Sequence, residues 1–144
     1  MKVAVLGGGP AGLYFAISMK LRNSAHEVTV VERNKPDDTF GWGVVLSAET
    51  LDNLTRHDPV SAVWITRYFA YGDDIAVIYK GVRTLSTGHG FCGIGRKRLL
   101  MLLQRRAREL GIKVEFETEV PDPRPYMETH DLVVAADGLN SRSR

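Results

Sequence analysis

The sequence is poor in the residues that build covalent or metal-bound frameworks. It has one cysteine, Cys92, in 144 residues, which excludes an internal disulfide and a cysteine-based structural zinc site. A single cysteine also fits the reducing cytoplasm, where we expect the protein to be located. The 4 histidines are scattered and lack metal-ligand spacing such as H-x-x-x-H, so we expect no metal centre.

A strong charge imbalance and long apolar runs are missing too. The 19 basic and 17 acidic residues leave a formal net charge of +2, which is too small to indicate nucleic acid or an anionic membrane as a partner. No apolar run approaches the length that spans a bilayer. Hydrophobic residues at 44% and charged residues at 25% are ordinary globular values, and the length predicts one domain with a real core.

A glycine-rich turn near the N-terminus carries the most specific signal. Gly7, Gly9 and Gly12 form a G-x-G-x-x-G pattern between an apolar run at 2–6 and a helix-like stretch at 11–22. Gly7 permits the tight turn off the strand, and Gly9 lets a pyrophosphate approach the backbone. Gly12 lets the helix pack closely on the sheet, and the helix N-terminus directs free N–H groups toward the phosphates. The pattern predicts a dinucleotide-binding βαβ unit.

An acidic residue stands where such a unit binds the ribose. Glu32 ends a second apolar run at 27–32 and lies 20 residues after Gly12. Its carboxylate can accept hydrogen bonds from ribose hydroxyls, and it opposes a 2′-phosphate at the same place. Lys2 and the apolar stretch after it superficially fit a secretory signal peptide. Three glycines and Pro10 interrupt that stretch, however, and no small-residue cleavage site follows.

The rest of the chain predicts alternating helices and strands, which indicates the α/β class. The segment 60–90 could be a strand excursion from the nucleotide-binding core toward the substrate-binding region. In chain order we expect a helix at 47–56 with Ser47 as N-cap, strands within 60–80, a structured loop at 84–95, a basic helix at 96–110 that stops at Gly111, a strand at 112–120, a turn at 122–125 and a buried strand at 131–137.

A second motif directly follows the last of these strands. Asp137, Gly138, Ser141 and Arg144 match D-G-x-x-S-x-x-R. An aspartate at the end of a buried strand can hold a ribose or order waters near a pyrophosphate, and the glycine lets the backbone come close. With this motif after the glycine pattern, the sequence resembles the single-component flavoprotein aromatic monooxygenases, the para-hydroxybenzoate hydroxylase-like family.

Two central segments narrow the resemblance. FGWGVVLSAETLDNL (40–54) and HGFCGIGRKRLLMLL (89–103) resemble the hydroxylases of aromatic acyl-CoA thioesters, the salicylyl-CoA 5-hydroxylase and anthraniloyl-CoA monooxygenase group. The resemblance implies a Rossmann-like FAD/NAD(P)-binding three-layer ββα fold, with FAD as cofactor and NADH or NADPH as reductant. It also implies O₂-dependent hydroxylation of a small aromatic substrate, a CoA thioester, through a flavin C4a-hydroperoxide in aromatic compound catabolism.

The resemblance assigns cofactor-binding residues but no catalytic side chain, because the flavin carries the difficult chemistry in such enzymes. Trp42 stands near the place where many relatives have an arginine that contacts the flavin. The assigned residues are Gly7, Gly9, Pro10, Ala11 and Gly12 at the FAD pyrophosphate, Glu32 with Arg33 at the adenosine ribose, Arg96 at the flavin side, Val120 closing a strand at the adenine edge, and Asp137 with Gly138 completing the set.

The family pattern extends beyond this sequence. A further G-D motif, whose aspartate binds the ribityl-pyrophosphate region, and most of the substrate-binding sheet are not among residues 1–144. We therefore expect this chain to be the N-terminal portion of the FAD-binding domain, truncated before the C-terminal part of the family fold. Two other interpretations remain open. One is a non-catalytic fragment with weak or no nucleotide binding, and the other is a different FAD- or NAD-dependent oxidoreductase.

The remaining reactive side chains are expected to have structural roles. The basic residues at 97–108 predict a solvated face opposite a leucine stripe, with an anion site for coenzyme A phosphates as the alternative. Cys92 is expected to be a small packed residue, and His89 a loop residue without a catalytic role. The aromatic residues expected in the core or on strand faces are Trp42, Trp64, Tyr68, Phe69 and Tyr71.

Overall fold

The computed structural model describes residues 1–36, 38–141 and 143. The chain divides into two compact units. The first combines Met1–Phe40 with Leu99–Arg144, and the second is Gly41–Arg98.

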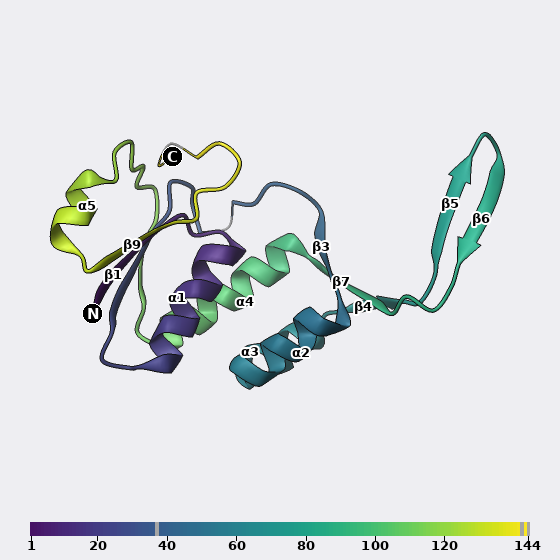
Figure 1. The fold of residues 1–144 in the computed structure, drawn as a ribbon, viewed down its shortest axis with the longest axis horizontal. Helices are drawn as coiled ribbons and strands as arrows, with labels where there is room; N and C mark the ends of the chain where they lie inside the picture. The colour runs from purple at the N-terminus through teal and green to yellow at the C-terminus, as the bar shows by residue number, and fades with distance from the viewer. Residues whose placement is uncertain (37, 142, 144) are drawn as a thin grey trace. The chain divides into compact units, whose positions relative to one another are not determined.

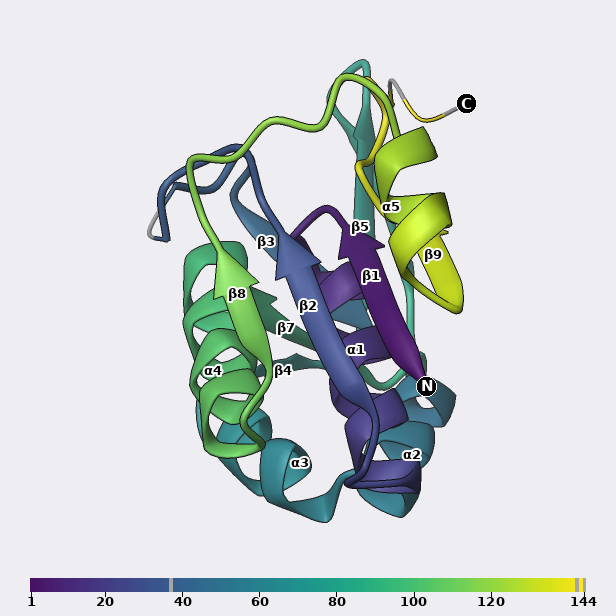
Figure 2. The same cartoon turned by 90° about the vertical axis from the view of Figure 1, so that its left-hand side faces the viewer.

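The first unit is built on a parallel sheet (Figures 1 and 2). Val3, Val5 and Val30 are fully buried, which is why these strands appear in the sequence as nearly continuous apolar runs. Consecutive parallel strands require a crossover, and the first one is the helix predicted after the glycine turn. Among the described residues the strand order is β8 (Lys113–Glu115), β2 (Glu27–Val31), β1 (Lys2–Leu6) and β9 (Leu132–Ala135).

Helices cover this sheet on both sides. Figure 1 shows α1 (Pro10–Arg22) and α4 (Arg96–Glu109) on one side and α5 (Arg124–Thr129) on the other. The inner face of α1 buries Leu13 and Ile17 completely. The parallel sheet, the α1 crossover and the helices on both faces make this unit a Rossmann-like α/β fold, as the sequence predicted.

The second unit contains short antiparallel sheets and a helix pair. β7 lies between β3 and β4, while β5 and β6 form a separate hairpin. The elements are β3 (Gly43–Leu46), α2 (Ala48–His57), α3 (Pro59–Thr66), β4 (Ala70–Gly72), β5 (Ile75–Tyr79), β6 (Val82–Ser86) and β7 (Phe91–Gly95).

One stretch expected to be extended is helical. The β-branched and aromatic residues at 60–66 predicted a strand, but α3 occupies Pro59–Thr66. Asp58 accepts a hydrogen bond from the Ser61 N–H, and Pro59 fills the first helical turn. These start signals outweigh the weak β preference of the residues that follow.

Other boundaries also differ from expectation. The segment 84–95, expected to be a structured loop, contains the end of β6 and all of β7. β7 is a strand because it pairs with β3 and with β4. The strand expected at 112–120 stops at Glu115, and the short helix α5 begins at Arg124, inside the turn expected at 122–125. The strand within 131–137 is half-buried rather than buried, because within the described residues β9 pairs only with β1.

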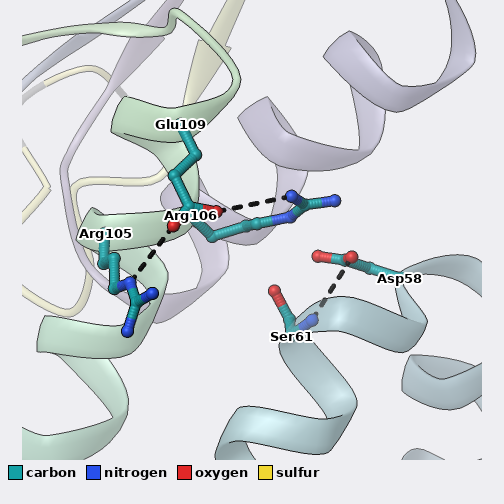
Figure 3. Close-up of polar contacts among 5 residues, drawn as sticks. All are labelled: Asp58, Ser61, Arg105, Arg106 and Glu109. Atoms are coloured by element: carbon teal, nitrogen blue, oxygen red, sulfur yellow. Dashed lines mark hydrogen bonds and ion pairs between the residues drawn. The ribbon is translucent and has the colours of Figure 1, made fainter.

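The cap at Asp58 gives a stability prediction. Asp58 is 1% exposed, and its Oδ1 accepts the Ser61 N–H at 3.3 Å (Figure 3). Replacing Asp58 with alanine removes the cap of α3 and should lower the free energy of unfolding by about 2 kcal/mol. Urea denaturation followed by circular dichroism measures the change.

The exposed cap of α2 provides the matched control. Ser47 accepts the Thr50 N–H at 3.3 Å, so Ser47→Ala should cost only about 0.5–1 kcal/mol. Asp58→Asn keeps a good capping group and should recover the part of the loss that is due to the cap. Equal effects of Asp58→Ala and Ser47→Ala would contradict the larger role assigned to the buried cap.

No helix in the described ranges is long and apolar enough to cross a membrane.

Candidate functional site

The glycine turn connects β1 to α1 at the carboxyl end of the sheet. Gly7 has φ +111°, and its N–H donates to the Val31 carbonyl at 2.8 Å. A Cβ on Gly7 would lie 2.6 Å from the Ala136 carbonyl carbon and 2.8 Å from the Asp137 nitrogen. Both the backbone conformation and this close approach require glycine here. Gly7 therefore lies against the start of the D-G motif, so the two sequence motifs are in contact.

Gly12 brings the helix close to the same turn. A Cβ on Gly12 would overlap the Gly7 carbonyl oxygen and lie 3.2 Å from the Ala136 Cβ. Ala136 itself donates its N–H to the Leu6 carbonyl at 2.7 Å. The packing role predicted for Gly12 is therefore seen in the structure, and Ala136 is a contact residue that the sequence did not reveal.

Gly9 differs from the other two glycines, because the space around it is open. Within the described part of the chain, no atom lies within 4 Å of a Cβ placed on Gly9. Gly9 is the N-cap of α1 and supplies no side-chain cap, and Pro10 occupies the first turn. The first N–H groups of a helix lack intrahelical partners and favour an anion. The open space and the uncapped turn, which includes Ala11, fit a pyrophosphate group.

Glu32 directly follows β2 and points back to the glycine turn. Its Oε2 accepts the Gly8 N–H at 2.7 Å, and its Oε1 accepts the Asn34 N–H at 2.8 Å and the Asn34 Nδ2 at 2.7 Å. A Cβ on Gly8 would lie 2.8 Å from the Glu32 Cβ. Sequence reasoning missed Gly8 and Asn34. The run of three glycines was a signal for Gly8, whereas nothing in the local sequence distinguished Asn34.

The second motif forms a tight turn after β9. The Asp137 Oδ2 accepts hydrogen bonds from the Ser143 N–H at 3.3 Å and the Ser143 Oγ at 3.1 Å. Ser143 was not predicted and stabilises the turn that contains Gly138. The Ser141 Oγ is buried and has no hydrogen-bond partner among the described residues. Arg144, the last residue of the motif, lies outside the described residues.

The other predicted site residues lie in both units. Arg33 is exposed. Val120 is half-buried and does not close a strand, because β8 ends at Glu115 and the chain beyond it leaves the sheet. In the second unit the Arg96 N–H donates to the Trp42 carbonyl at 3.2 Å. Trp42 is 99% exposed, so the expectation that its side chain is packed is wrong.

The basic helix α4 has the predicted two-faced character. Leu99, Leu100 and Leu103 are buried, while Lys97 and Arg108 are exposed. The charges near the end of the helix are partly paired, since Glu109 contacts Arg105 Nε at 3.1 Å and Arg106 Nη1 at 3.7 Å (Figure 3). Nearer the start of the helix, the Arg98 guanidinium lies 4.5 Å from the centre of the Tyr68 ring.

Other chemically active groups have local structural partners. Cys92 is buried, as predicted, and its Sγ lies 3.4 Å from the Leu46 carbonyl oxygen. The Asp122 pKa is lowered by its hydrogen bond to Arg124, and the Lys113 pKa is raised by its hydrogen bond to Glu115. In the described part of the chain, no group of three or more His, Cys, Asp or Glu side chains could hold a metal ion.

Comparison with known proteins agrees with this geometry. Salicyloyl-CoA 5-hydroxylase from Streptomyces sp is 47% identical over 144 residues, which are 100% of this chain and 28% of that protein. The 3-hydroxy-4-methyl-anthranilyl-[aryl-carrier protein] 5-monooxygenase from Streptosporangium sibiricum is 36% identical over 145 residues, covering 100% of this chain and 40% of that protein. The predicted similarity to the salicylyl-CoA 5-hydroxylase group is confirmed.

A solved structure shares the fold. A variant of 2-methyl-3-hydroxypyridine-5-carboxylic acid oxygenase superposes with a TM-score of 0.83 at 25% identity, covering 99% of this chain and 41% of that one. The chain thus spans less than half the length of each of these relatives. Residues 1–120 match the family described as pyridine nucleotide-disulphide oxidoreductase. The chain therefore belongs to the pyridine nucleotide-disulphide oxidoreductase family.

Proposed function

We propose that this chain is the FAD-binding portion of a flavoprotein monooxygenase that hydroxylates an aromatic acyl thioester. The observation that carries the proposal is the convergence of Gly9, Glu32 and Asp137 at the carboxyl ends of neighbouring parallel strands. In open α/β sheets, nucleotides bind at this edge. The relatives named above are hydroxylases and monooxygenases, which supports the reaction class.

The residues present suit the parts of FAD in different ways. Gly7 and Gly9 to Gly12 would hold the pyrophosphate against the start of α1, and Glu32 with Arg33 would bind the adenosine ribose. Val120 would contact the adenine edge through its backbone. Asp137 and Gly138 would line the second side of the pyrophosphate, and Trp42 with Arg96 would approach the flavin. These assignments rest on the family resemblance and on the open glycine turn.

When bound, FAD reduced by NADH or NADPH would supply the O₂-activating chemistry. The chain's own contribution is to bind and orient the nucleotide. The α1 N-terminus offsets the pyrophosphate charge, and the Glu32 carboxylate opposes a 2′-phosphate at the ribose. We place the enzyme in the cytoplasm, and we propose that residues 60–90 form a strand excursion toward the substrate-binding region.

A coenzyme A thioester is the substrate we favour. The relative with 47% identity has a CoA thioester in its name, whereas the relative with 36% identity has an aryl-carrier protein. Lys97 and Arg98 are exposed near the start of α4 and could meet the phosphates of coenzyme A. Oxidation of NADH or NADPH that is stimulated by salicyloyl-CoA supports this substrate class. Stimulation only by a carrier-protein thioester would instead favour a substrate attached to an aryl-carrier protein.

Nucleotide binding is the direct test of the cofactor assignment. We expect the chain to bind FAD and ADP in isothermal titration calorimetry. Glu32→Gln should weaken ADP binding about tenfold, because a charge-assisted hydrogen bond contributes roughly 1.5 kcal/mol. Glu128→Gln changes an exposed carboxylate on α5 and should leave the affinity unchanged.

The alternatives predict different outcomes in the same titrations. Binding of NAD without FAD would indicate a different oxidoreductase with this fold. A colourless chain that binds neither FAD nor ADP would contradict the proposal and support a non-catalytic fragment. Adenosine 2′,5′-bisphosphate should bind more weakly than AMP, which has the same 5′-monophosphate, because its 2′-phosphate would face Glu32.

A further inference from the structure

Asn34 holds the carboxylate that the ribose would meet. It lies two residues after Glu32 and donates to the Glu32 Oε1 twice, from its backbone N–H at 2.8 Å and from its Nδ2 at 2.7 Å. The other oxygen, Oε2, accepts the Gly8 N–H at 2.7 Å. The carboxylate is thus fixed between the exit of β2 and the glycine turn. Neither Asn34 nor Gly8 was among the residues assigned to the cofactor.

Hydrogen-bond accounting limits what this carboxylate can still accept. An ionised carboxylate offers about four acceptor positions. Asn34 fills both positions of Oε1 and Gly8 fills one position of Oε2. Among the described residues, one acceptor position therefore remains, and it is on Oε2. Asn34 determines that this is the oxygen left for a ligand.

The backbone of Asn34 is itself held in place. The chain leaving β8 donates to this segment twice, from Thr118 N to the Glu32 carbonyl at 3.0 Å and from Glu117 N to the Asn34 carbonyl at 3.2 Å. Glu117 has φ +53°, an unfavourable conformation for a residue with a side chain. A strained residue that directs its N–H to Asn34 indicates that the position of Asn34 is firmly specified.

We propose that Asn34 is a positioning residue that directs one oxygen of Glu32 toward a single ribose hydroxyl of the bound nucleotide. The same carboxylate holds the Gly8 N–H, so sugar recognition is coupled to the shape of the phosphate-binding turn. This inference rests on the nucleotide binding proposed above. Loss of Asn34 then weakens binding through the ribose, although Asn34 itself does not touch the ligand.

A thermodynamic cycle tests the ribose part of the inference. ADP and 2′,3′-dideoxy-ADP are titrated into the wild-type chain and the Asn34→Ala variant. Removal of both hydroxyls should weaken binding to the wild type about tenfold, and to Asn34→Ala less than about threefold, since the two changes disrupt one interaction. The same loss in both proteins would overturn the inference. Asn34→Asp, which replaces the Nδ2 donor with a like charge, should weaken ADP binding more than Asn34→Ala.

A control and a ligand-free measurement complete the test. Asn23 is the matched control, because its Oδ1 accepts a comparable short-range hydrogen bond from the Ala25 N–H at 2.9 Å. It lies at the opposite end of α1 from the glycine turn. Asn23→Ala should therefore leave the affinities for ADP and for 2′,3′-dideoxy-ADP unchanged. Without ligand, the Gly8 amide NMR signal should shift and exchange faster in Asn34→Ala, as in Glu32→Gln. An unchanged Gly8 amide would refute the positioning role. Lack of ADP binding by the wild type would instead refute the proposed function.

Discussion

Replacing Gly12 with alanine is expected to cause a large loss of stability. The new Cβ would overlap the Gly7 carbonyl oxygen, which is held in the turn between β1 and α1. The backbone at Gly7 and the backbone at Gly12 cannot move apart without separating α1 from the sheet. We expect a cost of about 3 kcal/mol or more, at or above the upper end for overpacking in a core. Urea denaturation and ADP titration should show loss of both stability and binding.

A glycine in open surroundings provides the control for this effect. Gly95 ends β7, and no described atom lies within 4 Å of a Cβ placed on it. Gly95→Ala should change the free energy of unfolding by less than about 0.5 kcal/mol. If Gly12→Ala were equally mild, α1 would not pack against the turn as closely as the structure indicates.

Replacing Gly9 with alanine should instead weaken binding while stability is retained. A Cβ on Gly9 meets no described atom of the protein within 4 Å and would project into the space proposed for the pyrophosphate. We expect ADP affinity to fall at least about tenfold, which corresponds to 1.4 kcal/mol. Because alanine is a poor N-cap, α1 should lose less than about 1 kcal/mol. Titration calorimetry and urea denaturation separate the two effects.

Serine at the same position separates capping from close approach. Gly9→Ser restores a good N-cap and should return the stability of α1 to the wild-type value or above it. Its Cβ still fills the open space, so the ADP affinity should stay below that of the wild type. Unchanged ADP affinity in Gly9→Ala would show that the phosphates do not bind against this residue.

The parts of the fold that were predicted correctly are encoded by neighbouring residues. The apolar runs of β1 and β2, the glycine turn and the cap of α2 at Ser47 each depend on short-range geometry. The helix α4 and its end before Gly111, which has φ +71°, follow from a local leucine pattern and a local stop signal.

The errors fall where distant segments decide the conformation. The glycine-rich segment FCGIG is a strand because β7 pairs with both β3 and β4, and a single sequence window holds no record of that pairing. Val120 lies beyond the end of β8, since β8 pairs with β2 for only a few residues. The helix α3 is the exception. Its local signals, Asp58 and Pro59, were present and were outweighed in the prediction by β-branched residues.

The sequence by itself determined the nucleotide-binding class of this protein and most of the residues expected to meet the cofactor. Glycine spacing, an acid after the second strand and the D-G motif are local patterns, so they can be recognised without coordinates. Only the tertiary structure showed that Ala136 packs against Gly7 and Gly12, and that Gly8 and Asn34 hold the Glu32 carboxylate. Those contacts join β1, β2 and β9, and parallel strands far apart in the chain come together only when the sheet forms.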